Sequence, residues 1–310
     1  MSKPKVLILT DWYVPGYKAG GPIQSVFNLI RLLKDRIDFR VITSDRDLND
    51  SKPYHTVIVD SWMDKDGIKV LYASLENRNR LISQEINNGK FDFLYLNSFF
   101  SLNFTLLPIF HAFRKNNIRK VILAPRGMLG EGALRIKPSK KKLFLLLFKS
   151  LRLHKRILFQ STDVSETKSI RNALGEGVAV HQLANIPLVV DQQVEFENRN
   201  PGTFIFASRV SPKKNLKYLL DRLSELHKQN FSTSIYGEAD DEDYLESCEG
   251  YIDSLPIKFY GAIPPNELHL QFLKHRFFVL PTLNENFGHA IIEALSFGCP
   301  VIISDQTPWN

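Results

Sequence analysis

The sequence has few cysteines and no long hydrophobic run. Cys248 and Cys299 are its only cysteines, far apart and without the paired spacing of metal ligands, which predicts neither a disulfide framework nor a zinc site. The longest apolar run, residues 143–148, is far shorter than the roughly 20 residues that cross a bilayer. Near the N-terminus, residues 6–9 resemble a short buried strand and not the longer apolar segment of a signal peptide, so we expect a cytoplasmic protein.

Low-complexity tracts are also missing. Of the 310 residues, 44% are hydrophobic, 24% charged and 11% aromatic, a composition that excludes disordered, collagen-like and coiled-coil proteins. The length is about twice that of a common domain, which favours two domains with separate hydrophobic cores.

Acidic residues are scarce in the first part of the chain. Residues 1–190 contain 30 Lys and Arg against 16 Asp and Glu, a net charge of +14, whereas residues 191–310 contain 10 against 17, a net charge of −7. Within residues 111–156, 14 basic residues accompany a single acid, Glu131. Such a segment either meets an anionic partner or stays solvated.

Short apolar runs alternate with amphipathic segments along the chain, a pattern typical of parallel sheets covered by helices. A polar stretch, residues 198–202, separates two series of predicted strands. We therefore predict an α/β protein of two doubly wound domains, residues 1–197 and 203–310, with a ligand cleft between them at the carboxyl ends of the strands. The predicted strands are residues 6–9, 39–42, 93–96, 121–124 and 157–160, then 203–207, 232–236, 257–260, 277–280 and 301–304.

The loop after residues 277–280 carries the strongest motif. Glu285 lies in this loop, Gly288 precedes a predicted helix, and Glu293 follows Glu285 by eight residues, about two helical turns. A helix N-terminus directs backbone amides toward an anion such as a phosphate, and carboxylates accept hydrogen bonds from sugar hydroxyls. Both glutamates can then face one cleft; the alternative is two solvated side chains on an amphipathic helix.

This segment resembles a signature of the retaining glycosyltransferases of family four, in which two glutamates are separated by seven residues. Members of that family have the GT-B fold of two facing Rossmann-like domains. Residues 286–288 and 293–300 match the family's pattern as well. The resemblance implies that Glu285 contacts the donor sugar and Glu293 the donor ribose. It also implies that the diphosphate is bound by backbone amides at Phe287, Gly288, His289 and Ala290.

A basic motif follows the first strand of the second domain. Arg209 and Lys214 lie five positions apart, and Ser211 and Pro212 suit the start of a helix. We expect Lys213 and Lys214 in its first turn, where the helix dipole disfavours cations unless an anion is bound. The family has an arginine and a lysine at this spacing, which implies that Arg209 and Lys214 bind the donor diphosphate and stabilise it as the leaving group. Lys213 is expected to be a solvated neighbour.

Two adjacent glycines, Gly20 and Gly21, end a long loop, and Pro22 suits the first turn of the helix that follows. They do not form the dinucleotide fingerprint of three spaced glycines and can be only a turn. In the family, this pair faces the donor diphosphate and sugar, which implies the same role here.

Arg126 lies in the first of three further stretches similar to the family: residues 123–129, 160–168 and 185–187. The Arg126 stretch resembles a subgroup associated with bacterial surface polysaccharide synthesis. Many family members have a histidine in this loop, whereas this chain has Pro125, Arg126 and Gly127, so no role that requires an imidazole is expected. Arg126 is a candidate contact for a sugar, a phosphate or the acceptor; the alternative is a surface arginine in a tight turn.

Residues 140–156 are predicted to form a strongly cationic, amphipathic helix. Such a helix can lie on the surface of an anionic membrane, or it can be an ordinary helix with a charged outer side. Nucleic acid is not an expected partner, because no recognition motif accompanies the charge.

No metal or cofactor is predicted. The acidic pairs Asp45/Asp47 and Asp64/Asp66 and the cluster at residues 240–243 lie in polar segments that we interpret as solvated loops, and the histidines lack ligand spacing.

The predicted function is retaining transfer of a sugar from a nucleotide diphosphate sugar to an acceptor hydroxyl. The expected acceptor is a glycan or lipid-linked molecule in the synthesis of capsule, O-antigen or exopolysaccharide, with the enzyme in the cytoplasm or on the inner face of the plasma membrane. A sugar-nucleotide epimerase or a phosphorylase of the GT-B fold is an alternative. So is a non-catalytic binding module, because family members continue beyond residue 310 and the second domain is expected to be incomplete.

Overall fold

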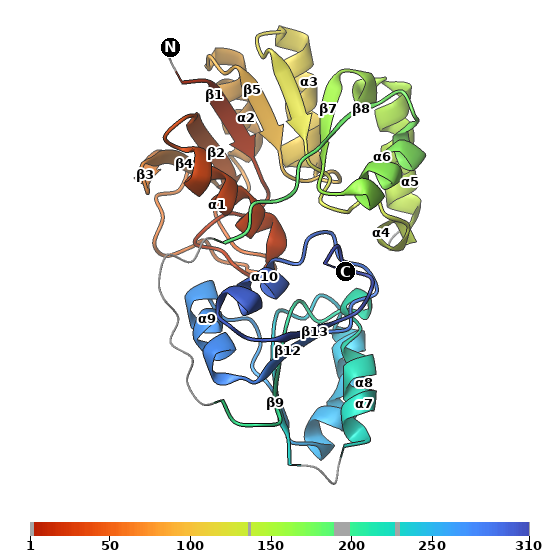
Figure 1. Cartoon of the computed structure of the whole chain (residues 1–310). Helices are drawn as coiled ribbons and strands as arrows, with labels where there is room; N and C mark the ends of the chain where they lie inside the picture. Colours follow the sequence, from red (N-terminus) through yellow and green to blue (C-terminus); the bar gives the residue numbers. More distant parts are fainter. Residues whose placement is uncertain (1–2, 136–137, 189–198, 227–229, 310) are drawn as a thin grey trace. The chain divides into compact units, whose positions relative to one another are not determined.

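The computed structural model describes residues 3–135, 138–188, 199–226 and 230–309, which form two compact units (Figure 1). The first unit contains Met1–Gly16 and Pro22–Asn185, and the second contains Tyr17–Gly21 and Ile186–Asn310. The predicted linker begins at Asn198, which lies outside the described residues. The exact domain bounds therefore stay a prediction.

The first unit contains an eight-stranded sheet in the order β3-β4-β2-β1-β5-β6-β7-β8. Neighbouring strands are parallel, except that β3 and β4 are antiparallel. The strands are β1 Lys5–Leu9, β2 Asp38–Ser44, β3 Trp62–Lys65, β4 Ile68–Ala73, β5 Phe93–Leu96, β6 Lys120–Leu123, β7 Ile157–Ser161 and β8 Ala179–Gln182. The α-helices are α1 Gly21–Leu33, α2 Arg78–Asn88, α3 Leu107–Lys115, α4 Glu131–Arg135, α5 Pro138–Ser150 and α6 Val164–Leu174, with shorter turns η1 Leu102–Leu106 and η2 Leu153–Lys155.

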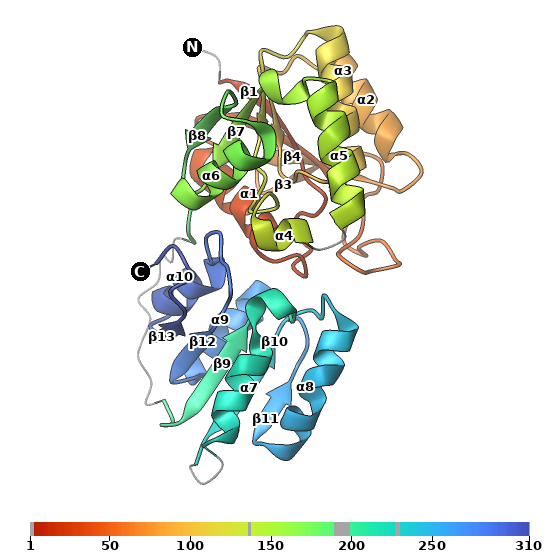
Figure 2. The ribbon, with the colours of Figure 1, turned by 90° about the vertical axis from the view of Figure 1, so that its right-hand side faces the viewer.

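This sheet has a hydrophobic core on each face. In β1, Leu7 and Leu9 belong to one core and Val6 and Ile8 to the other, because successive side chains of a strand point to opposite faces. Residues of α2, α3, α5 and α6 complete the first core, and residues of α1 complete the second. Figure 2 shows α2, α3 and α5 on the same side of the sheet.

The second unit contains a five-stranded parallel sheet in the order β11-β10-β9-β12-β13. Helices α7 and α8 cover one face, and α9 and α10 cover the other (Figures 1 and 2). The strands are β9 Thr203–Ala207, β10 Ser232–Tyr236, β11 Ile257–Phe259, β12 Phe277–Leu280 and β13 Val301–Ile303. The helices are α7 Leu216–Ser224, α8 Glu242–Ser254, α9 Pro265–Lys274 and α10 His289–Ser296, with the short turn η3 Pro212–Lys214 before α7.

Each of the ten predicted strands has a counterpart in the structure, and β3, β4 and β8 are additional. The interpretation of Asp64 and Asp66 as a polar loop is wrong for Asp64, which lies in β3. Asp66 and Gly67 turn the chain between β3 and β4 with φ of 54° and 82°. An Asp-Gly pair with two positive φ angles is typical of a tight hairpin, so this dipeptide was the sequence signal for the missed strands.

Replacement of Gly67 by Ala tests this hairpin. A Cβ at Gly67 meets no atom within 4 Å, so the cost is the left-handed backbone alone, about 1 kcal/mol of unfolding free energy. Chemical denaturation should measure this loss. Gly132→Ala is the matched control, because its Cβ also meets nothing within 4 Å and it lies in α4, where alanine is favourable. An equal effect of the two substitutions would contradict the explanation.

Candidate functional site

The two motifs of the second domain lie against each other. Strands β9 and β12 are parallel neighbours, so the loops at their carboxyl ends meet at one edge of the sheet. We name residues 208–215 the β9 loop and residues 281–288 the β12 loop. The amide of Leu283 donates to the carbonyl of Lys213 at 2.9 Å, and the side-chain amide of Asn215 donates to the carbonyl of Pro281 at 3.2 Å. Residues about 70 positions apart in the sequence thus form one site.

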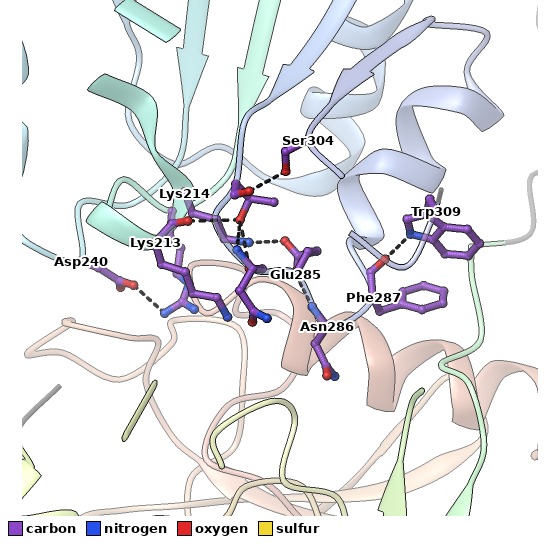
Figure 3. A network of polar contacts seen from close by, with 11 residues as sticks. Lys213, Lys214, Asp240, Glu285, Asn286, Phe287, Ser304 and Trp309 are labelled. Atoms are coloured by element: carbon purple, nitrogen blue, oxygen red, sulfur yellow. Dashed lines mark hydrogen bonds and ion pairs between the residues drawn. The ribbon is translucent and has the colours of Figure 1, made fainter. Parts of the chain in front are cut away.

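An ion pair between Lys214 and Glu285 lies at the centre of this site (Figure 3). The two side chains are only 11% and 13% exposed. Taking two charges out of water is costly unless they neutralise each other and form further hydrogen bonds. Glu285 has such a bond, because its second carboxylate oxygen accepts from the amide of Asn286 at 3.1 Å.

The environment of Glu285 favours its charged form. Burial by itself raises the pKa of this carboxyl group, but the charge and hydrogen bond of Lys214, the charge of Lys213 and the amide of Asn286 together lower it below its usual value. Glu285 is therefore a carboxylate at neutral pH. As such it can accept hydrogen bonds from a sugar and cannot act as an acid.

The expected helix at Ser211 takes a different form. Residues Pro212–Lys214 form a short 3-10 turn, Asn215 has a left-handed φ of 58°, and α7 begins only at Leu216. The side chain of Ser211 makes no capping hydrogen bond; its carbonyl accepts from the amide of Lys214 at 3.0 Å. The expectation of two lysines in an α-helical first turn is thus wrong, and the anion that balances Lys214 is Glu285.

Arg209 is paired with Asp240, which lies after β10. Its guanidinium is 2.7 Å from the Asp240 carboxylate, and the arginine side chain stays 41% exposed. Asp240 was expected to be merely solvated, as part of an acidic cluster. No local pattern indicates the pairing, because it depends on β9 and β10 being neighbours.

The start of α10 requires a glycine. Gly288 has a φ of 76°, a backbone conformation that residues with a side chain rarely adopt, and a Cβ there would lie 2.7 Å from the end of the Ile291 side chain, so a larger residue would be strained at this position. The ring of Phe287, the residue before Gly288, lies 4.7 Å from the ring of His289, the residue after it. The Phe287 ring also lies 5.2 Å from the ring of Trp309, whose indole donates to the carbonyl of Phe287 (Figure 3). These contacts hold the segment from which the first amides of α10, at His289 and Ala290, extend.

Glu293 has a different partner from Glu285. It lies in α10, is 5% exposed, and its carboxylate is 3.7 Å from a ring nitrogen of His269 on α9. The sequence gives no signal for this pairing, because the histidines lack ligand spacing. The ribose contact implied for Glu293 stays a prediction.

Arg126 is the centre of a polar network in the first unit. Its guanidinium donates to Asn97 at 2.7 Å, to the hydroxyl of Tyr95 at 2.7 Å and to Asn185. The Tyr95 hydroxyl donates in turn to Gln160 at 2.8 Å. The three stretches that resemble the family in the first domain therefore meet at one place, near the carboxyl ends of β5 and β7.

The turn that carries Arg126 is tight, as one of the alternatives predicted. Arg126 and Gly127 have φ angles of 56° and 74°, and the amide of Met128 donates to the carbonyl of Pro125 at 3.1 Å. Glu166 holds the turn by accepting from the Gly127 amide at 2.6 Å. The guanidinium of Arg126 is hydrogen-bonded within the protein, so Arg126 is more than a solvated surface residue. Its contact with a sugar, a phosphate or the acceptor stays a prediction.

The glycine pair is divided between loop and helix. Gly20 has a φ of 65° and a Cβ would meet no atom within 4 Å, so it is required by backbone conformation. Gly21 is the first residue of α1. Their contact with the donor stays a prediction.

Two features are absent from the part of the chain that the structure describes. No group of three or more His, Cys, Asp or Glu there is arranged to hold a metal ion. No helix of that part is long and apolar enough to cross a membrane.

Comparison with known proteins supports the family and the fold. Residues 190–309 match the model of the family Glycosyl transferases group 1. The O-antigen chain mannosyltransferase B of Escherichia coli is 28% identical over 111 residues, which cover 34% of this chain and 29% of that protein. The matches to curated relatives span only 21% to 29% of the relatives' own lengths.

Solved structures resemble nearly the whole chain. Sucrose-phosphate synthase from Thermosynechococcus elongatus has a TM-score of 0.67 at 14% identity, covering 99% of this chain and 82% of that one. The pneumococcal O-GlcNAc transferase, in complex with UDP and GlcNAc, has a TM-score of 0.63 at 11% identity, covering 100% and 85%. The predicted GT-B fold of two Rossmann-like domains is therefore confirmed, and residues 190–309 are similar to the glycosyl transferases of group 1.

The Lys214–Glu285 pair predicts an acid-sensitive stability. Because the folded pKa of Glu285 lies below its unfolded value of 4.5, its contribution is present above pH 4.5 and is lost as pH falls through the folded pKa. Glu285→Gln should cost on the order of 3 kcal/mol at neutral pH, since it leaves Lys214 buried without a partner. Urea unfolding measured across this range should show the difference from the wild type shrinking in acid.

Glu249→Gln is the matched control, because Glu249 is an exposed glutamate of α8 in the same unit. It should leave the unfolding free energy nearly unchanged at every pH. A difference between Glu285→Gln and the wild type that stays constant down to strongly acidic pH would contradict the assignment.

Proposed function

We propose that this protein transfers a hexose from a nucleotide diphosphate sugar to an acceptor hydroxyl with retention of the anomeric configuration. The observation that carries the proposal is the meeting of the β9 and β12 loops. It brings Lys214 and Glu285 into contact at the sheet edge where Rossmann-like folds bind nucleotides. The group 1 family match and the structural likeness to a transferase complexed with UDP support the same class of donor.

Two kinds of positive group would hold the diphosphate. Arg209 keeps its guanidinium 41% exposed although it pairs with Asp240, and guanidinium groups bind phosphate oxygens in a bidentate manner. The first amides of α10 add the positive end of the helix dipole. Donor binding would place the phosphates near Lys214, whose charge is at present balanced by Glu285.

The chemical step would stabilise charge on the leaving group. As the bond from the anomeric carbon to the diphosphate breaks, negative charge grows on the departing phosphate, and preorganised cations and amides stabilise such charge more than any other catalytic device. The acceptor oxygen forms its bond to the anomeric carbon on the same face. The acceptor's proton passes to the departing phosphate oxygen, so the protein need not supply a general base. Glu285, as a carboxylate, would hold the sugar hydroxyls.

The acceptor is proposed to be a glycan or lipid-linked molecule of bacterial surface polysaccharide synthesis. Support comes from the similarity to an O-antigen chain mannosyltransferase and from the Arg126 network, which fixes a cation at the carboxyl ends of strands in the first unit. The reaction would take place in the cytoplasm or at the inner face of the plasma membrane, with the nucleotide sugar as a substrate and no cofactor.

Arg209→Ala and Lys214→Ala test the donor site. Each should lower the release of nucleoside diphosphate by about 100-fold or more, the usual effect of removing one group that stabilises transition-state charge. Lys217→Ala and Arg222→Ala are matched controls, because they remove exposed cations of neighbouring α7. Turnover within about twofold of the wild type in either site variant, with folding verified by circular dichroism, would overturn the assignment.

Product analysis separates the alternatives. Isothermal titration against a panel of nucleotide sugars first identifies the donor, and reaction with a lipid-linked acceptor follows. A new glycosidic bond with retained configuration supports the proposal. Isomerised donor would indicate an epimerase, a sugar phosphate would indicate a phosphorylase, and binding without turnover would indicate a binding module.

A further inference from the structure

We infer that one face of α5 is a docking surface for the interface of an anionic lipid membrane. Three leucines of this helix, Leu143, Leu146 and Leu147, are 58%, 65% and 46% exposed, and Leu151 just beyond it is 50% exposed. At about 100° per residue, the first three occupy an arc of about 100°, the width of an apolar helix stripe. This stripe points away from the hydrophobic core of its own unit.

The opposite side of α5 is firmly packed, so the exposed leucines are not a sign of a badly placed helix. Phe148 is fully buried, and its ring lies 5.0 Å from the ring of Phe99. Phe144 contacts Phe99 at 5.6 Å and Phe100 at 5.3 Å. The helix therefore has two apolar sides, and among the residues that the structure describes only the aromatic side is covered.

Basic side chains border the exposed leucines on both sides. By the same helical spacing, Lys140 lies beside one edge of the stripe, and Lys142 and Lys149 lie beside the other; all three are exposed. No acidic residue occurs between Glu131 and Asp163. An apolar stripe between cationic borders is complementary to a bilayer surface that offers acyl chains beneath anionic headgroups.

Some basic residues of this segment also contact the first unit itself, and the exposed Lys149 donates to the carbonyl of Ala173 at 3.4 Å. Lys141 donates to the carbonyl of Ala133 at 2.5 Å and lies 5.3 Å from the ring of Phe100, and the guanidinium of Arg156 lies 3.9 Å from the ring of Phe113. These two cations serve the packing of the first unit. The lipid surface is thus formed by only part of the cationic segment 140–156.

Other occupants fit the surface less well. A second copy of this chain placed on the same stripe would bring the borders of Lys140, Lys142 and Lys149 close to one another, and like charges repel. A nucleic acid would gain nothing from the exposed leucines, because its outer surface is phosphate and sugar. An anionic bilayer satisfies both the apolar and the basic residues.

Sedimentation with vesicles tests the inference independently of any sugar transfer. The full chain should bind vesicles of mixed phosphatidylglycerol and phosphatidylcholine at low salt, bind pure phosphatidylcholine much less, and be released by high salt. The variants L143Q/L146Q/L147Q and K140E/K142E/K149E should each lower the partition coefficient by about tenfold or more. The substituted side chains are exposed, so circular dichroism should show unchanged folding.

A composition-matched control is available. The variant L32Q/L75Q/L270Q removes three other leucines that are 56%, 47% and 54% exposed, and it should bind vesicles like the wild type. Absence of binding at low salt, or unchanged binding by the α5 leucine variant, would overturn the inference. So would light scattering that shows a dimer dissociated by the α5 leucine substitutions, because the surface would then join two copies of the chain.

Discussion

The site of the second unit depends on one buried ion pair. Lys214 and Glu285 come from loops about 70 positions apart, and each would be costly to bury alone. They meet because β9 and β12 are adjacent and parallel, which places both carboxyl-end loops at one edge of the sheet. The same pairing fixes the turn Pro212–Lys214 and the path of the β12 loop toward Gly288. Core packing of the strands and charge neutralisation in the loops therefore support each other.

The two units hold their central cations in different ways. In the second unit, carboxylates neutralise them: Glu285 pairs with Lys214 and Asp240 with Arg209. In the first unit, Arg126 donates to the neutral oxygens of an asparagine pair and a tyrosine. This difference agrees with the net charges of −7 and +14 in the two parts of the sequence. A cation held by neutral groups keeps more of its field, which suits the attraction of an anionic ligand.

The sequence predicted the elements better than the contacts. Buried parallel strands such as Phe93–Leu96 and Phe277–Leu280 are continuous apolar runs between polar segments, so their positions follow from the pattern. Strand β8 was missed because Ala179–Gln182 is mostly exposed and has no apolar run. The start of α7 was misplaced because Asn215 adopts a left-handed conformation that interrupts an otherwise favourable helical sequence.

The sequence by itself determined the class of fold, the two motifs that define the candidate donor site and the cationic character of residues 140–156, because these depend on residue type and local spacing. Only the tertiary structure decided that Glu285 pairs with Lys214 while Glu293 lies beside His269. It also decided that Lys141 packs inward although Lys140 and Lys142 are exposed. Partners of this kind are set by which strands and helices become neighbours, and spacing along the chain carries no information about a side chain that arrives from another element.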